Sequence, residues 1–312
     1  MMLALVTLAA GGCSEGGDIA FPVDEIESSP VRRPAFDGAV AFTLLERQVA
    51  FGPRVPGTAG HAAQLRWMRE WLLERADSVS DQSFTHRTLA GDTLRLTNLF
   101  ASFRPEERRR VLLLAHWDTR PTSDAASDPG ERSVPVPGTN DGASGTAVLL
   151  HLAELLRRDP PPIGVDILLV DGEDYGPTLR DMLLGATWFA ANLPTGYDPT
   201  YAVLLDMVGD RDPRFPVEGY SAEMAPAVAS RIWGIAASLG YGDIFPAEVG
   251  PHIVDDHLPL NRAGLPTVSI IDFEYGPGNS YWHTPRDVPA NTSPRTLGIV
   301  GEVLAELIYR GG

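Results

Sequence analysis

Cysteine is almost absent from this 312-residue chain, in which Cys13 is the only one. One cysteine cannot form a disulfide within the chain, and it excludes a zinc site built from several thiolates. Basic residues are also few, since 25 of them face 41 acidic residues and leave a net charge of −16. This charge repels nucleic acid and anionic membrane surfaces. A bound metal would therefore need histidine and carboxylate ligands.

Long apolar runs are missing after Ala10, and nothing there approaches the ~20 apolar residues that cross a bilayer. Residues 1–10 are almost wholly apolar and lead into Gly11-Gly12-Cys13-Ser14, which resembles a signal peptide ending at a bacterial lipoprotein cysteine. We expect an exported protein of the periplasm or cell envelope, lipid-anchored at Cys13. The alternative is an ordinary cleaved signal with an incidental cysteine.

The domain organisation follows from composition and hydrophobic pattern. Residues 1–13 are predicted to be the signal, and residues 14–34, rich in Gly, Ser, Pro and acids, a flexible tether. Residues 35–312 should form one folded domain. Short apolar runs predict buried strands at 111–114, 165–170, 202–205 and 268–271. Helical spacing predicts two helices between 36 and 77, and others at 146–158, 183–192, 222–239 and 294–310.

This alternation predicts an α/β fold, with a central twisted, mostly parallel sheet flanked by helices on both faces. Unusual polar residues follow the predicted strands or open a helix: His116-Trp117-Asp118, Asn140-Asp141-Gly142, Asp171-Gly172-Glu173-Asp174, Asp206 and Trp282-His283. Each could be a helix cap, a solvated loop or an ordinary core residue. Together they should meet at one edge of the sheet, where clustered carboxylates are costly without a cation. Imidazole and oxygen ligands without thiolates suit Zn²⁺.

Six segments, in this order, resemble bacterial glutaminyl-peptide cyclotransferases, which belong to the same superfamily as the zinc aminopeptidases. The resemblance extends from about Phe42 to the C-terminus. The segments are His116-Trp117-Asp118-Thr119-Arg120-Pro121, Asn140-Asp141-Gly142-Ala143-Ser144-Gly145, Glu173-Asp174-Tyr175-Gly176, Leu205-Asp206-Met207-Val208-Gly209, Asp255-Asp256-His257 and Trp282-His283-Thr284.

The resemblance implies an enzyme that cyclises the N-terminal glutamine of peptides or proteins to pyroglutamate and releases ammonia. It implies one zinc ion, whose protein ligands would be Asp141, Asp174 and His283. Glu173 would be the general acid and base, and Asp206 and Asp255 would form a hydrogen-bonded acidic pair beside it. Trp282 would form a wall of the substrate pocket.

Two alternatives stay open. A two-zinc aminopeptidase would use His116 and Asp206 as ligands of a second metal, with Asp141 bridging the two ions. Asp255 lies where aminopeptidases usually carry serine, and Trp282 precedes the last metal histidine, where they usually carry another residue. Both departures favour the cyclase. The other alternative is an anchored binding module that kept the fold without the chemistry.

Overall fold

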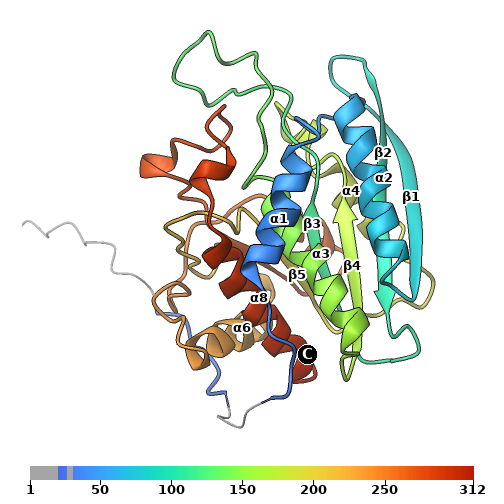
Figure 1. Cartoon of the computed structure of the whole chain (residues 1–312), viewed down its shortest axis with the longest axis vertical. Coiled ribbons are helices and arrows are strands. Elements are labelled where there is room, and N and C mark those ends of the chain that lie inside the picture. The colour runs from blue at the N-terminus through green and yellow to red at the C-terminus, as the bar shows by residue number, and fades with distance from the viewer. Residues whose placement is uncertain (1–19, 27–30) are drawn as a thin grey trace, which may run out of the picture.

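A six-stranded sheet runs through the centre of the structure, a computed structural model that describes residues 20–26 and 31–312 (Figure 1). Its strands are β1 (Ser78–Arg87), β2 (Thr93–Phe103), β3 (Arg110–His116), β4 (Gly164–Val170), β5 (Ala202–Asp206) and β6 (Thr267–Ile271). Their order in the sheet is β1-β2-β4-β3-β5-β6. The strands β4, β3, β5 and β6 are parallel to one another, whereas β2 is antiparallel to both of its neighbours.

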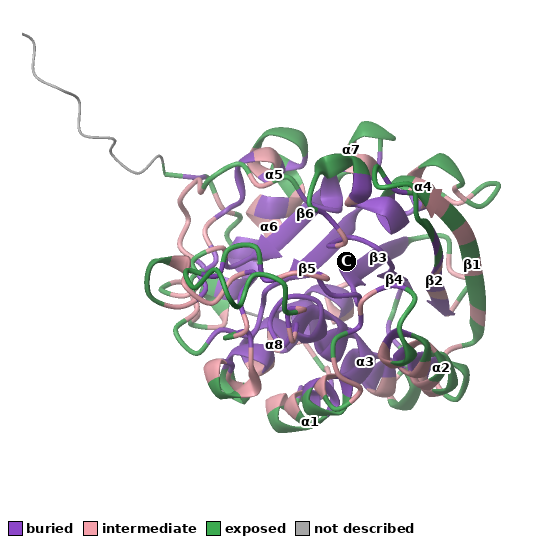
Figure 2. Ribbon diagram, turned by 90° about the horizontal axis from the view of Figure 1, so that it is seen from above, coloured by how far each residue is buried: buried purple, intermediate pink, exposed green. Residues whose placement is uncertain are grey.

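Helices cover both faces of the sheet. They are α1 (Gly38–Val49), α2 (Ala59–Leu73), α3 (Ala143–Arg158), α4 (Leu184–Ala191), α5 (Gly219–Met224), α6 (Pro226–Ser238), α7 (His257–Arg262) and α8 (Pro294–Tyr309). Short 3-10 turns occupy Leu179–Asp181, Pro277–Asn279 and Pro289–Asn291. Figure 2 shows α1, α2, α3 and α8 on one side of the sheet and α4, α5 and α7 on the other. The predicted α/β architecture is confirmed.

The four parallel strands are the ones that the apolar runs predicted. Every residue of β3, β4, β5 and β6 is buried. Because helices cover both faces of these strands, each side chain lies in an apolar layer and the sequence shows no alternation. This is why continuous apolar runs located the strands correctly.

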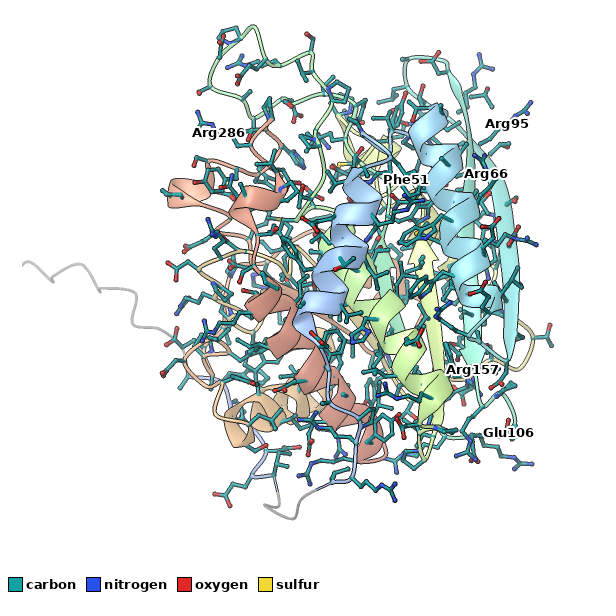
Figure 3. The ribbon with its side chains drawn as sticks, viewed as in Figure 1. Phe51, Arg66, Arg95, Glu106, Arg157 and Arg286 are labelled. Carbon is teal, nitrogen blue, oxygen red and sulfur yellow. The ribbon has the colours of Figure 1, made fainter. Side chains whose placement is uncertain are left out.

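The antiparallel hairpin of β1 and β2 was not predicted. β1 is the edge strand, and all of its residues are exposed or half-buried, so it lacks an apolar run. Arg66 on α2 and Arg95 on β2 extend outward from this edge of the molecule (Figure 3). Polar and charged side chains suit an edge strand because they discourage pairing with another chain.

The helix predicted over 222–239 is divided in the structure. α5 ends at Met224, and α6 begins at Pro226. Proline has no amide hydrogen to donate and favours the first turn of a helix, so it starts a new helix here instead of continuing the old one. The single long helix was therefore a wrong prediction.

Part of the predicted tether packs against the folded body. Phe21 is buried in the main core, and its N–H donates to the carbonyl of Ala247 at 2.8 Å. Asp24 accepts a hydrogen bond from the Ser230 hydroxyl at 2.8 Å. A flexible tether over 14–34 is thus wrong for residues 20–26. The predicted signal and Cys13 lie outside the described residues, among which no helix is long and apolar enough to span a bilayer.

Candidate metal centre and active site

The predicted metal ligands meet at the carboxyl edge of the parallel strands. His116 ends β3, Asp206 ends β5, and Asp174 follows β4. Asp141 comes just before α3, and His283 lies between β6 and α8. The segment between β3 and α3 forms the long green loop at the top of Figure 1. The chain passes from β3 to β4 and then back across β3 to β5. Ligand sites of α/β sheets lie where the strand order reverses in this way.

Two potential metal-binding groups share Asp141. One consists of His116, Asp141 and Asp206, and the other of Asp141, Asp174 and His283; in each, the ligand atoms lie within 4.8 Å of one another. His116 Nε2 lies 3.1 Å from Asp141 Oδ1 and 3.2 Å from Asp206 Oδ1. His283 Nε2 lies 3.6 Å from Asp141 Oδ2 and 3.3 Å from Asp174 Oδ1. Each oxygen of Asp141 therefore faces one group.

The donor set fits a zinc ion. Asp141, Asp174 and His283 are all buried, and Asp174 Oδ2 has no hydrogen-bond partner among the described residues. Burial alone would lower the pKa of His283, but the carboxylates of Asp174 and Asp124 raise it to about 9. Buried carboxylates and imidazoles at this density are stabilised by a cation, and two oxygens with one imidazole are ligands that zinc accepts.

Two buried aspartates hold the backbone that carries the ligands. Asp118 accepts hydrogen bonds from the N–H groups of Glu173 at 3.0 Å and Asp174 at 3.2 Å. Asp287 accepts from the N–H groups of Asn140 at 2.7 Å and Asp141 at 3.2 Å. Sequence reasoning singled out Asp118 only as part of a polar segment that follows a predicted strand. It missed Asp287, because nothing in the local pattern separates a buried anchor from a solvated aspartate.

Glu173 lies beside the ligands without joining either group. Its Oε2 is 3.8 Å from His116 Nδ1, and its side chain is buried. Burial, together with the negative charge of Asp174, raises the pKa of Glu173 well above its usual range. A carboxyl in such surroundings can carry a proton near neutral pH, which is what a general acid and base requires.

Asp206 and Asp255 are close enough for their charges to interact. Burial, followed by the charge of Asp206, raises the pKa of Asp255 to about 7. Asp255 accepts from the N–H of Asp256 at 2.6 Å and the Ser269 hydroxyl at 3.2 Å, while Asp206 contacts His116. The two carboxyls are therefore electrostatic neighbours, and the hydrogen bond between them stays a prediction.

Trp282 and Asp171 also belong to the polar segments predicted at this edge of the sheet, and they have different surroundings. Trp282 stacks on His283, with ring centroids 3.7 Å apart, and also contacts the ring of Phe273. Trp282 is half-buried beside His283, and its role as a wall of the substrate pocket stays a prediction. Asp171, in contrast, belongs to neither metal-binding group and contacts His61 Nε2 at 2.8 Å. His61 is itself buried.

Residues 98–308 match the model of peptidase family M28. The chain belongs to this family. The match begins in β2 and ends in α8, so it includes every parallel strand and all the predicted metal ligands.

Solved structures of similar proteins carry two kinds of description. A glutaminyl cyclase from Bacteroides thetaiotaomicron is 37% identical, with 90% of this chain and 100% of that chain covered and a TM-score of 0.86. A leucine aminopeptidase precursor from the same species is 36% identical, with 91% and 100% covered and a TM-score of 0.87. Among curated proteins, the mouse glutaminyl-peptide cyclotransferase-like protein is 27% identical over 81% of this chain and 70% of its own length. The resemblance to cyclotransferases within a zinc peptidase superfamily is confirmed.

Proposed function

We propose that this protein is a zinc-dependent glutaminyl-peptide cyclotransferase. It would convert the N-terminal glutamine of peptides or proteins to pyroglutamate and release ammonia. Glutaminyl-peptide cyclotransferases among the curated relatives support this proposal, as do the solved cyclases at 37% and 35% identity. A structural relative of nearly equal identity is described as an aminopeptidase, so the geometry of the site has to distinguish the two activities.

The surroundings of Asp206 favour the cyclotransferase over the aminopeptidase. A second metal would need Asp206 and His116 as firmly held ligands. Asp206 instead lies beside a second buried carboxyl, that of Asp255, whose pKa burial and the charge of Asp206 raise to about 7. We infer that Asp141, Asp174 and His283 hold the single zinc ion.

The side chains supply the remaining chemistry. The α-amine of glutamine attacks its own side-chain amide carbon, a C–N bond closes the lactam, and the amide nitrogen leaves as ammonia. Glu173 accepts the proton from the attacking amine and donates it to the leaving nitrogen. Trp282 supplies an apolar wall that orients the glutamine chain. When bound, zinc polarises the amide carbonyl as a Lewis acid.

A two-metal aminopeptidase is the second candidate, and one observation favours it. The ligand atoms of both groups are already gathered, and each Asp141 oxygen faces a different group. A bridging carboxylate of this kind suits a two-metal site. The complete set of ligands and the buried Glu173 argue against a binding module without chemistry.

Parallel assays test the proposal. Zinc-loaded protein is incubated with a glutaminyl and a leucyl peptide, while ammonia release and peptide-bond cleavage are followed separately. We expect ammonia and pyroglutamate from the glutaminyl peptide. Cleavage of the leucyl peptide without pyroglutamate formation would establish the aminopeptidase instead.

Substitution of Glu173 separates proton transfer from metal binding. Glu173→Gln should retain zinc, because Glu173 is outside the ligand group, and should lose at least ~100-fold in kcat, the scale of general acid and base catalysis. His283→Ala should lose both zinc and turnover. Zinc content by atomic absorption and initial rates provide the readouts. An active Glu173→Gln enzyme would show that another group moves the proton.

We also propose that the protein is exported and carries a lipid at Cys13, on the motif described above. Its acidic surface would then meet peptides in the cell envelope. Labelling of cells with a radioactive fatty acid should mark the wild-type protein and spare Cys13→Ser. Equal labelling, or none in the wild type, would exclude the anchor.

A further inference from the structure

Two charged residues outside the ligand group connect Asp174 to His283. Arg120 Nη1 donates to Asp174 Oδ1 at 2.7 Å. The same guanidinium binds both oxygens of Asp124, from Nε at 2.9 Å and from Nη2 at 2.8 Å. Asp124 Oδ1 lies 3.4 Å from His283 Nδ1. The four side chains form a continuous series that begins at one ligand and ends at the other.

The position of this series is held by the surrounding chain. The N–H of Ala125 donates to the carbonyl of His283 at 3.3 Å, which ties the loop of Asp124 to the backbone of the histidine. Gly176 lies against the guanidinium of Arg120. A Cβ atom there would approach Nη1 to 2.6 Å, and its φ of +61° also disfavours other residues. Arg120 is itself buried, so it has little freedom to adopt another arrangement.

The contacts have a consequence for each ligand. A carboxylate facing Nδ1 favours the tautomer with hydrogen on Nδ1, which leaves the lone pair of His283 Nε2 for a metal. Arg120 occupies Asp174 Oδ1 on one side, and Oδ2 has no hydrogen-bond partner among the described residues. The orientation of both ligands is thus determined by groups that do not touch the metal themselves.

We propose that Arg120 and Asp124 are positioning residues that arrange Asp174 and His283 before the metal binds and thereby strengthen zinc affinity. The inference rests on the proposed role of Asp174 and His283 as zinc ligands. It applies equally to a cyclase and to an aminopeptidase, because it concerns the metal and not the substrate. Arginine is suited to the role since its planar guanidinium binds two carboxylates at once with fixed geometry.

The test uses two variants and a readout independent of turnover. Arg120→Lys keeps the charge but cannot reproduce the three directed N–H contacts, and Asp124→Asn removes the acceptor charge facing Nδ1. The zinc dissociation constant of the full chain is measured by competition with a chelating dye. We expect each variant to weaken zinc binding about 10-fold or more, the usual effect of residues that orient metal ligands.

Arg110→Lys is the matched control. Arg110 binds both oxygens of Asp166 at 2.7 and 2.8 Å in a buried pair, but at the opposite end of the parallel strands. It should lose stability and keep the wild-type dissociation constant. Chemical unfolding of each metal-free variant shows which of them are folded.

The outcomes separate the inference from the proposed function. The inference is overturned if folded Arg120→Lys, or Asp124→Asn, binds zinc with a dissociation constant within about twofold of the wild-type value. It is also overturned if Arg110→Lys loses as much zinc affinity as these two variants. If Arg120→Lys does not fold, Asp124→Asn decides alone, since the Asp124 side chain is 39% exposed and tolerates change. A wild-type protein that binds no zinc would instead overturn the metal site itself.

Discussion

Removal of the Asp287 carboxylate should both destabilise the fold and displace a metal ligand. Asp287 is fully buried and accepts three hydrogen bonds, from the N–H groups of Asn140 and Asp141 and from the hydroxyl of Tyr275 at 2.9 Å. Asp287→Ala leaves these donors without their acceptor inside the protein. Since Asp141 faces both metal-binding groups, a shift of its backbone affects the whole site.

The size of the effect follows from two opposing contributions. A buried donor without a partner costs about 1–3 kcal/mol, so three of them cost about 6 kcal/mol in the middle of that range. Burial, and then the charge of Asp141, raises the pKa of Asp287 to about 7. Relief of this unfavourable charge offsets up to about 4 kcal/mol, the equivalent of a three-unit shift. We expect the free energy of unfolding to fall by about 2–4 kcal/mol. The lower value is the difference between the two contributions, and the upper value adds the lost attraction between Asp287 and Arg54.

Urea unfolding of the metal-free protein at pH 7 measures the loss, and dye competition measures zinc affinity. Asp287→Asn is the graded control, because its amide oxygen still accepts one or two of the hydrogen bonds. The order of stability should be wild type, Asp287→Asn and then Asp287→Ala. An Asp287→Ala protein within 1 kcal/mol of the wild type, with unchanged zinc affinity, would refute the view that this carboxylate holds Asp141 in place.

Two other predictions concern packing and pH. Gly145→Ala should lower the free energy of unfolding in urea by about 1–3 kcal/mol, because the new Cβ would lie 2.2 Å from the Leu205 carbonyl oxygen. Gly298→Ala is the control and should be neutral or stabilising, because the nearest atom to its Cβ lies at 3.5 Å. Equal effects of the two substitutions would contradict this prediction. Burial raises the pKa of Asp272 to about 7. The folded protein then binds more protons than the unfolded chain between about pH 4 and 7, so this group lowers the free energy of unfolding as pH rises through that range. Asp272→Asn should make the measured slope less negative by up to about 1.4 kcal/mol per pH unit, and parallel curves would count against the shifted pKa.

The amino-acid sequence by itself determined the parallel part of the sheet and the membership of the metal site. Strands buried on both faces are largely apolar, so continuous apolar runs in the sequence predicted β3, β4, β5 and β6. Carboxyl ends of parallel strands converge, so His116, Asp174 and Asp206 could be placed together before any distance was known. The single cysteine limited the ligands to the residue types that the structure brings within 4.8 Å.

Only the tertiary structure decided which polar side chains support the ligands and how. Arg120 belonged to a segment of the family resemblance and Asp124 to the loop after it, but neither had a predicted partner until the fold set them between Asp174 and His283. Asp287 became an anchor only when the chain after β6 returned to the start of α3. The physical reason is that an ionisable residue has the same local sequence signature whether it faces solvent or a buried partner. Burial and direction depend on segments that lie 54 residues away or more along the chain, which no local pattern specifies.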